Sequence, residues 1–106
     1  MRNAVVASLL GLLISGPAVA DVGTARQAEL LYLLKHDCGS CHGMRRLGGL
    51  GAPLNAGTLA GRSDDDLTGI ILDGMPGTPM PPWRPFINPD EARWLVDFLR
   101  NGEAGQ

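Results

Sequence analysis

Apolar residues recur at helical spacing in three segments of the chain, and two irregular stretches separate these segments. We expect helices over residues 24–37, 63–74 and 88–102, because apolar side chains three or four residues apart form one face of an α-helix. No segment alternates as a half-buried strand does. The chain is therefore predicted to be all-α. The apolar faces comprise Ala28, Leu30, Leu31, Leu33 and Leu34, then Leu67, Ile70 and Ile71, then Ala92, Leu95, Val96 and Leu99 with Trp94 and Phe98 beside them.

Each expected helix begins with residues that can satisfy the free backbone N–H groups of a first turn. The first and third helices have the spacing of a capping box, and the third also has proline at its first position. Three carboxylates at residues 64–66 complement the helix dipole. We interpret them as a solvated helix start, with partner docking as the alternative. The caps are Thr24 with Gln27, Ser63, and Asn88 with Pro89 and Glu91, and the stops are Gly74 and Gly102.

The two irregular stretches have distinct compositions, and we name them the glycine loop (residues 43–61) and the proline-rich loop (residues 75–85). Residues 43–61 contain six glycines, which indicates a loop that lies closely against something rather than a regular element. A loop this long is unusual in a compact domain unless it has a role. The leucines of this loop would contact the group that the loop surrounds. Residues 75–85 contain five prolines, which remove backbone donors and fix φ, so a stiff extended loop is expected. The loop leucines are Leu47, Leu50, Leu54 and Leu59.

The first twenty residues have the pattern of a cleaved export signal. Arg2 is followed by an apolar run, and Ala18-Val19-Ala20 is a small-x-small cleavage site. The alternative, a membrane anchor, is disfavoured because a spanning helix needs roughly 20 apolar residues. We therefore expect a signal peptide over 1–20 and one domain over 21–106. The net charge of −2, without a basic run, gives no indication of nucleic-acid binding.

The segment Cys38-Gly39-Ser40-Cys41-His42 forms a Cys-x-x-Cys-His motif, which is typical of covalent attachment of a c-type haem. Two thiols add across the two vinyl groups of the porphyrin, and His42 is placed to bind the iron from one side. Both cysteines of the chain are used, so none remains for a disulfide framework. A thiol redox site is the alternative, but such sites lie in a βαβ context that this chain lacks. A domain this small can bury only a limited apolar surface, and a bound haem would add to its hydrophobic core.

The second axial ligand is expected to be a methionine. His36 lies on the same approach helix as His42 and cannot easily reach the opposite face of the iron. Met44 follows His42 too closely to leave its side of the ring. Met75 and Met80 both precede a proline in the rigid loop. We favour Met80 because the neighbouring prolines restrict the loop that would hold its sulfur on iron, and Met75 is the alternative.

Trp83 and Arg84 follow the favoured ligand directly. An indole N–H and a guanidinium can both donate hydrogen bonds to the haem propionates. We expect such a contact for Trp83 and also for Arg84. The alternative places Trp83 in the core and leaves Arg84 in solvent.

The haem motif, the glycine loop and the run Gly77-Thr78-Pro79-Met80-Pro81-Pro82-Trp83 together resemble a class I (mitochondrial-type) cytochrome c domain. Residues 24–101 are most similar to the small NirC-type monohaem cytochromes encoded with the haem c/haem d1 nitrite reductase of denitrifying bacteria. The resemblance implies a small cytochrome c fold, in which three main helices and their loops surround one covalently bound haem.

The same resemblance implies a periplasmic electron carrier. We also expect a monomer without a stable membrane anchor. It would donate electrons to the nitrite reductase or, alternatively, assist in the maturation of the d1 haem of that enzyme. If His42 and Met80 fill both axial positions, no site remains for a substrate, and we expect a carrier rather than an enzyme. A module in which Met80 dissociates to admit a small ligand is a further alternative.

One departure from the class I pattern concerns the proximal loop. These domains usually have Gly-Pro-x-Leu there, and the proline carbonyl accepts a hydrogen bond from the ligand histidine. This chain has Gly51-Ala52-Pro53-Leu54, with proline one position later. We therefore expect the Ala52 carbonyl to be the acceptor that orients His42.

Overall fold

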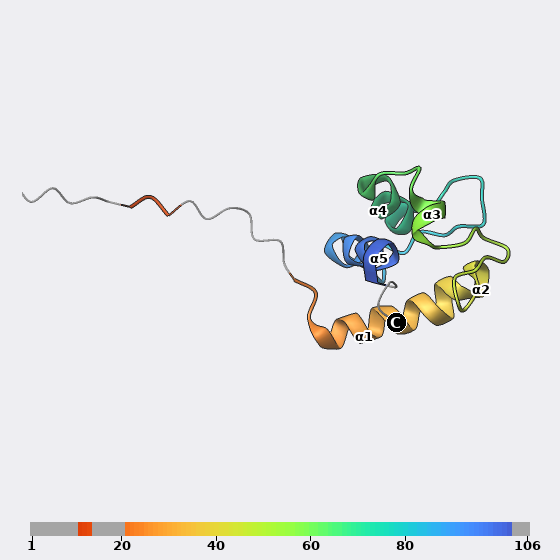
Figure 1. Cartoon of the computed structure of the whole chain (residues 1–106), viewed down its shortest axis with the longest axis horizontal. Helices are drawn as coiled ribbons and strands as arrows, with labels where there is room; N and C mark the ends of the chain where they lie inside the picture. The colour runs from red at the N-terminus through yellow and green to blue at the C-terminus, as the bar shows by residue number, and fades with distance from the viewer. Residues whose placement is uncertain (1–10, 14–20, 103–106) are drawn as a thin grey trace, which may run out of the picture.

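A computed structural model describes residues 11–13 and 21–102 of the chain (Figure 1). Every regular element in these ranges is helical, which confirms the all-α prediction. The predicted signal peptide lies outside the described residues, apart from 11–13. No helix in the described part is long and apolar enough to cross a membrane. The elements are α1 (Thr24–Leu33), the π-helix η1 (Leu34–Cys38), α2 (Gly39–His42), α3 (Ala56–Leu59), α4 (Asp64–Asp73) and α5 (Pro89–Asn101).

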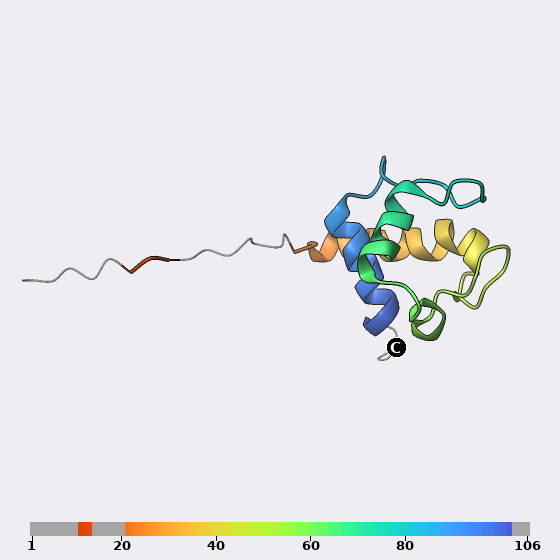
Figure 2. The same ribbon diagram turned by 90° about the horizontal axis from the view of Figure 1, so that it is seen from above.

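α1, η1 and α2 follow one another as a single rod, which is the long helix in Figures 1 and 2. The rod begins at Thr24, the residue that was expected to be its N-cap. Gly23 is the N-cap, Thr24 lies within the first turn, and the expected capping box does not form. The side chain of Gln27 instead donates to the Val22 carbonyl at 2.8 Å. The box is therefore wrong, because Thr24 stands one position too late to cap.

The rod also continues beyond the expected end near Asp37. Gly39 is accommodated in the helical conformation, and the helix stops only at Gly43, whose φ of 88° is one that glycine adopts readily. The haem motif is therefore part of the rod rather than the loop after it. Within the rod, Leu30 and Leu34 are the most buried residues, whereas Ala28, expected on the apolar face, is exposed.

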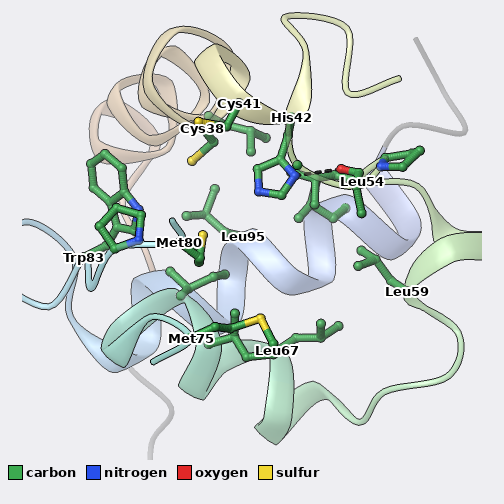
Figure 3. Close-up of a pocket in the computed structure, with 18 of the residues that line it drawn as sticks. Cys38, Cys41, His42, Leu54, Leu59, Leu67, Met75, Met80, Trp83 and Leu95 are labelled. Atoms are coloured by element: carbon green, nitrogen blue, oxygen red, sulfur yellow. Dashed lines mark hydrogen bonds between the residues drawn. The ribbon is translucent and has the colours of Figure 1, made fainter. Parts of the chain in front are cut away.

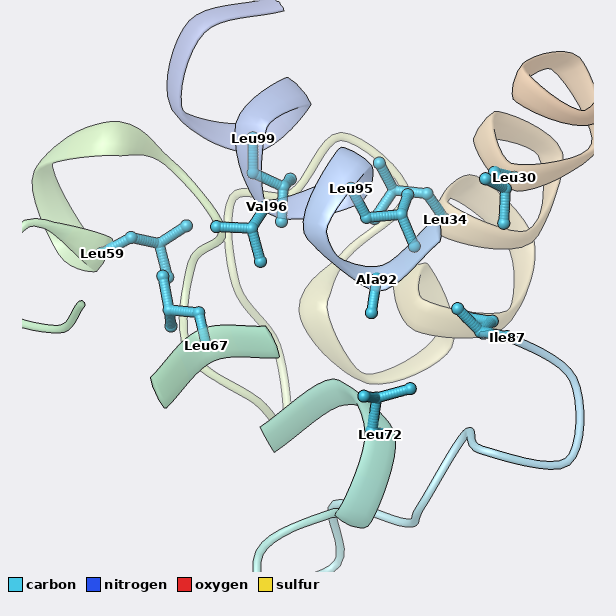
Figure 4. Close-up of a cluster of buried hydrophobic side chains, with 10 residues drawn as sticks. All are labelled: Leu30, Leu34, Leu59, Leu67, Leu72, Ile87, Ala92, Leu95, Val96 and Leu99. Atoms are coloured by element: carbon cyan, nitrogen blue, oxygen red, sulfur yellow. The ribbon is translucent and has the colours of Figure 1, made fainter. Parts of the chain in front are cut away.

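The core lies on both sides of α5 (Figure 4). Figure 4 shows Leu30 and Leu34 of the rod on one side of this helix, and Leu59 and Leu67 on the other. The predicted face of α5 is buried in full. Ile70 of α4 is only half-buried, as is its neighbour Ile71. The buried hydrophobic residues of the core are Leu30, Leu34, Leu59, Leu67, Leu72, Ile87, Ala92, Leu95, Val96 and Leu99.

The expected caps of α4 and α5 are confirmed. The Ser63 hydroxyl accepts from the Asp66 amide at 3.1 Å. Asn88 and Glu91 form a reciprocal capping box, in which each side chain accepts from the backbone of the other residue. Both helices thus begin where the sequence indicates, because the capping groups are local and need no distant partner.

The acidic run at the start of α4 is exposed, as expected, and it also joins α4 to α5. Asp64 accepts from Arg100 at 2.6 Å, and Asp65 pairs with Arg93. The helix-dipole argument does not predict either pair, because their partners lie about thirty residues further along the chain. The carboxylates therefore hold the angle between two helices that both border the cavity described below.

Arg26 ties the start of the rod to the start of α5. Its guanidinium donates to both carboxylate oxygens of Glu91, at 2.8 and 3.1 Å, to Glu29 at 2.7 Å and to the Phe86 carbonyl at 2.8 Å. The hydrogen bonds from Arg26 hold the pKa of Glu91 below its usual value. Glu91 is therefore both a helix cap and an ion-pair partner.

We expect Arg26→Gln to lower the free energy of unfolding at pH 7 by about 1 kcal/mol, between the values for exposed pairs and for buried charged hydrogen bonds. Because the folded pKa of Glu91 is depressed, the contribution is present above the unfolded value of about 4.3 and is lost as pH falls through the folded value. Urea unfolding of holoprotein at pH 7 and pH 3 measures this difference. Arg93→Gln, at an exposed pair, should have a smaller effect; equal losses for the two variants would contradict the prediction.

Candidate haem-binding site

A cavity of about 490 Å³ lies between the C-terminal part of the rod, the glycine loop, α4, the proline-rich loop and α5 (Figure 3). This volume is in the range of cofactor pockets, roughly 300–1,000 Å³. Apolar residues, among them leucine, isoleucine, proline, methionine and valine, make up most of its wall. The half-buried Ile70 and Ile71 belong to this wall, and Ile71 also packs against the core. Such a lining suits a large, flat, apolar group.

Cys38, Cys41 and His42 all line the cavity, so the structure brings the three chemical groups of the motif to one wall. Both cysteines are free. Burial, assisted by the charge of Asp37, raises the pKa of the Cys38 thiol to about 11. Catalytic redox cysteines have a lowered pKa, because the thiolate is the nucleophile. The environment of Cys38 is thus unlike that of a thioredoxin-type site.

The His42 ring is held by one hydrogen bond. Its Nδ1 lies 2.7 Å from the Ala52 carbonyl oxygen, which confirms the acceptor expected from the displaced proline (Figure 3). A carbonyl can only accept, so Nδ1 carries the proton and Nε2 keeps its lone pair. A hydrogen bond of this kind fixes the tautomer and orientation of a metal-ligating histidine and raises its basicity. His42 is thereby prepared to bind a metal through Nε2.

The glycine loop holds the end of the rod through its backbone. The Gly51 N–H donates to the Cys41 carbonyl at 2.8 Å, and the Gly48 N–H donates to the His42 carbonyl at 2.8 Å. These bonds satisfy carbonyls that a helix end leaves free. A Cβ on Gly51 would lie only 2.7 Å from Nδ1 and Cε1 of the His42 ring. Glycine is therefore required here so that the loop can pass directly behind the imidazole.

The proline-rich loop places Met75 and Met80 on the cavity wall. The Met75 N–H donates to the Met80 carbonyl at 3.2 Å, and the Thr78 hydroxyl donates to the Met75 carbonyl at 2.7 Å. In the view of Figure 3, His42 projects from the upper wall, while Met80 and Met75 lie below it and Met75 lies further from the cysteines. Since both methionines reach the cavity, the preference for Met80 stays a prediction.

The end of α4 fits closely against this loop. Gly74 has a φ of 70°, and a Cβ there would lie 2.6 Å from the Met80 carbonyl oxygen. Glycine thus permits a close backbone contact beside Met80, as Gly51 does beside His42. The backbone N–H of Trp83 donates to the Ile71 carbonyl at 3.0 Å, so the loop is also fixed to α4 at a position after Met80.

Four further residues singled out in the sequence differ in whether they reach the cavity. Trp83 lines the cavity, whereas Arg84 does not. Arg84 donates twice to Asp73, at 2.8 and 2.9 Å, so its expected contact with haem propionates is wrong because a carboxylate of the chain already occupies the guanidinium. Leu47 is 67% exposed and does not contact the cavity, unlike the other three loop leucines. His36 is exposed and packs on Tyr32, away from the cavity.

Comparison with known proteins identifies relatives along most of the chain. Residues 24–99 match the family described as cytochrome c oxidase, cbb3-type, subunit III. The chain is 55% identical to a cytochrome c55X of Paracoccus denitrificans, over 91% of this chain and 94% of that protein. It is 48% identical to a cytochrome c55X of Pseudomonas aeruginosa, over 82% and 75%.

Two solved structures are also similar. The c-type cytochrome NirC superimposes with a TM-score of 0.75 at 49% identity, over 77% of this chain and 96% of that one. The dihydro-heme d1 dehydrogenase NirN, in complex with DHE, gives a TM-score of 0.62 at 31% identity, over 66% of this chain and 15% of that much longer one. The first confirms the small cytochrome c fold. The cytochrome c55X and NirC relatives support the expectation of a cytochrome rather than an enzyme.

The cavity also fits the cofactor that this classification implies. Its walls are apolar, two thiols and a histidine with a free Nε2 lie at one side, and two thioethers lie at the other. Haem c would be held by thioether bonds from Cys38 and Cys41. The chain therefore belongs to the c-type cytochromes and is a small NirC-type cytochrome with one covalently bound haem c.

Proposed function

We propose that this cytochrome is a periplasmic one-electron carrier that donates electrons to the haem c/haem d1 nitrite reductase. The observation that carries the proposal is the pairing of a histidine ligand with thioethers across one apolar cavity. His42 and one of these thioethers would hold the iron of the haem between them, which would leave no place for a substrate. Similarity to NirC supports the link to nitrite reduction.

The residues of the chain have separate tasks in this function. Haem c supplies the reversible uptake of one electron, and a thioether ligand favours its reduced form. His42, held by the Ala52 carbonyl, keeps a fixed ring orientation. Leucines of α4 and α5 line the cavity and would shield the haem from water. The protein thus offers binding, orientation and a dry environment, and no acid–base chemistry is needed.

Rapid mixing of the reduced cytochrome with oxidised haem c/haem d1 nitrite reductase tests the proposal. We expect bimolecular oxidation of the cytochrome with a rate constant of at least about 10⁵ M⁻¹s⁻¹ at physiological salt, the ordinary lower range for docking proteins. A Cys38→Ser, Cys41→Ser double variant, which cannot attach haem, controls for contaminating reductants. Absence of electron transfer at physiological salt would contradict the proposal.

A second candidate function is electron acceptance during maturation of the d1 haem. It is supported by the similarity to part of NirN, a dihydro-haem d1 dehydrogenase. Such a dehydrogenation releases two electrons and two protons, so two molecules of a one-electron carrier would be reduced per substrate oxidised. Mixing the oxidised cytochrome with the dehydrogenase and its dihydro substrate tests this: reduction in a two-to-one ratio supports the role, and no reduction opposes it.

A further inference from the structure

The glycine loop exposes apolar side chains at the edge of the cavity. Met44, Leu47 and Leu50 are each more than half exposed, and Leu50 reaches 80%. Leu50 also lines the cavity, so this leucine lies at the cavity edge. Isolated exposed apolar residues are ordinary, but several on one short segment indicate a surface that a partner covers.

The same loop carries a charge opposite to that of the whole chain. The chain has a net charge of −2, whereas residues 38–63 contain three arginines and no lysine, aspartate or glutamate. Arg45 stands between the exposed Met44 and Leu47 and is itself exposed. It forms no ion pair with any residue of the ranges 11–13 and 21–102. Its guanidinium is therefore available to a carboxylate of another molecule.

The backbone of this segment is fixed although its side chains are exposed. The Arg46 N–H donates to the Gly43 carbonyl at 2.9 Å, and the Arg46 carbonyl accepts from the Leu54 N–H at 3.0 Å. The Arg46 guanidinium lies 5.8 Å from the centre of the Phe98 ring, which joins the loop to α5. A preformed surface loses little conformational entropy when a partner binds, so the loop is suited to docking.

The loop also connects the surface to His42. Ala52 is exposed, and its carbonyl accepts from Nδ1 of His42 at 2.7 Å. A partner seated on the loop would be separated from the metal-binding Nε2 by the imidazole ring, one short hydrogen bond and one residue of backbone. Figure 2 shows this loop beyond the C-terminal end of the rod, whereas α5 begins near the start of the rod.

We propose that Met44, Arg45, Leu47, Leu50 and Ala52, the glycine-loop face, form the docking surface for a redox protein that presents carboxylates around an apolar centre. The proposal rests on the function proposed above, because it states where the carrier meets its partner. A second copy of this chain fits poorly, since a two-fold interface would place the same arginines on both sides. An acidic partner gives complementary potentials, which speed encounter.

Equilibrium binding to the haem c/haem d1 nitrite reductase, with both proteins oxidised so that no electron moves, tests the proposal. Leu50→Ser should raise Kd about tenfold, because a central apolar contact is lost. Arg45→Gln should raise Kd about threefold at low ionic strength and have almost no effect at roughly 1 M salt, where exposed charges are screened. Both side chains are exposed, so the variants should fold as the wild type does.

Phe86→Ser and Arg93→Gln are the matched controls. Phe86 is apolar and exposed, but its carbonyl accepts from Arg26 near the other end of the rod. Arg93 is an exposed cation of α5 that pairs with Asp65. Both controls should bind the reductase as the wild type does. Equal losses in Phe86→Ser and Leu50→Ser, or unchanged binding in Leu50→Ser and Arg45→Gln, would overturn the proposal.

A reductase that does not bind the wild-type cytochrome would contradict the proposed function, and hexacyanoferrate(III) then tests the surface alone. This small anion takes one electron from the reduced cytochrome without a docking protein. Arg45→Gln should slow that reaction about threefold at low ionic strength, and Arg93→Gln should change it much less. Equal rates for the two variants would overturn the assignment. Self-association of the wild type that Leu50→Ser abolishes would also overturn it, because the occupant would be a second copy.

Discussion

Replacing Met80 with alanine is expected to remove the Fe–S charge-transfer band at the red end of the oxidised spectrum and to lower the reduction potential by on the order of 0.1 V. Axial ligands set haem potentials over a range of ~0.8 V, and a thioether favours the reduced state. The variant should also bind carbon monoxide near neutral pH, because one axial position becomes free. Absorption spectra of both oxidation states and a redox titration measure these changes.

Met75→Ala is the matched control for this prediction. Both methionines line the cavity and both precede proline, so the two truncations remove similar volumes from the same loop. Met75→Ala should keep the band and exclude carbon monoxide. If the band disappears in Met75→Ala and persists in Met80→Ala, the ligand is Met75. If neither variant loses it, the assignment of a methionine ligand is wrong.

Gly51→Ala is expected to disturb the iron from the other side of the ring. The new Cβ would lie 2.7 Å from two atoms of the imidazole, so either His42 must turn or the loop must withdraw. The 2.7 Å bond from Nδ1 to the Ala52 carbonyl would then weaken. Overpacking of this kind costs about 1–3 kcal/mol of stability. Since the bond raises ligand basicity, weakening it should also raise the potential by roughly 60 mV, a tenfold change in the redox equilibrium.

Gly61→Ala provides the comparison, because no atom lies within 4 Å of a Cβ at that position of the same loop. It should leave the potential and the unfolding midpoint almost unchanged. Redox titration and urea unfolding of the two holoproteins measure the difference. An unaltered potential and midpoint in Gly51→Ala would show that the close approach of the loop to His42 does not orient the ligand.

Features set by neighbouring residues could be predicted from the sequence. The capping box at Asn88 and the N-cap at Ser63 are examples, because donor and acceptor lie within one turn. The haem motif is another, since its three reactive groups occupy five consecutive residues. The hydrogen bond from His42 to Ala52 could be anticipated because the displaced proline of a known pattern indicated it.

Features that depend on distant partners could not be predicted. The sequence makes Arg84 available to the cofactor, whereas in the fold its guanidinium pairs with Asp73. The rod passes through Cys38 in a π-helical turn, which periodicity counted at 3.6 residues per turn cannot indicate. Sequence spacing describes one helix at a time, whereas these outcomes belong to pairs of elements.

The apolar cavity has a consequence for the speed of electron exchange. When one charge enters or leaves a site, every dipole that must turn in response adds to the reorganisation energy. Here few dipoles can respond: leucine and isoleucine side chains border the site, and the loops on its two faces are held by backbone hydrogen bonds at Gly48, Gly51 and Met75. A preorganised surrounding of this kind needs little rearrangement at the moment of transfer. The cytochrome should therefore exchange electrons rapidly even with partners of nearly equal potential, which suits a carrier that must both load and unload.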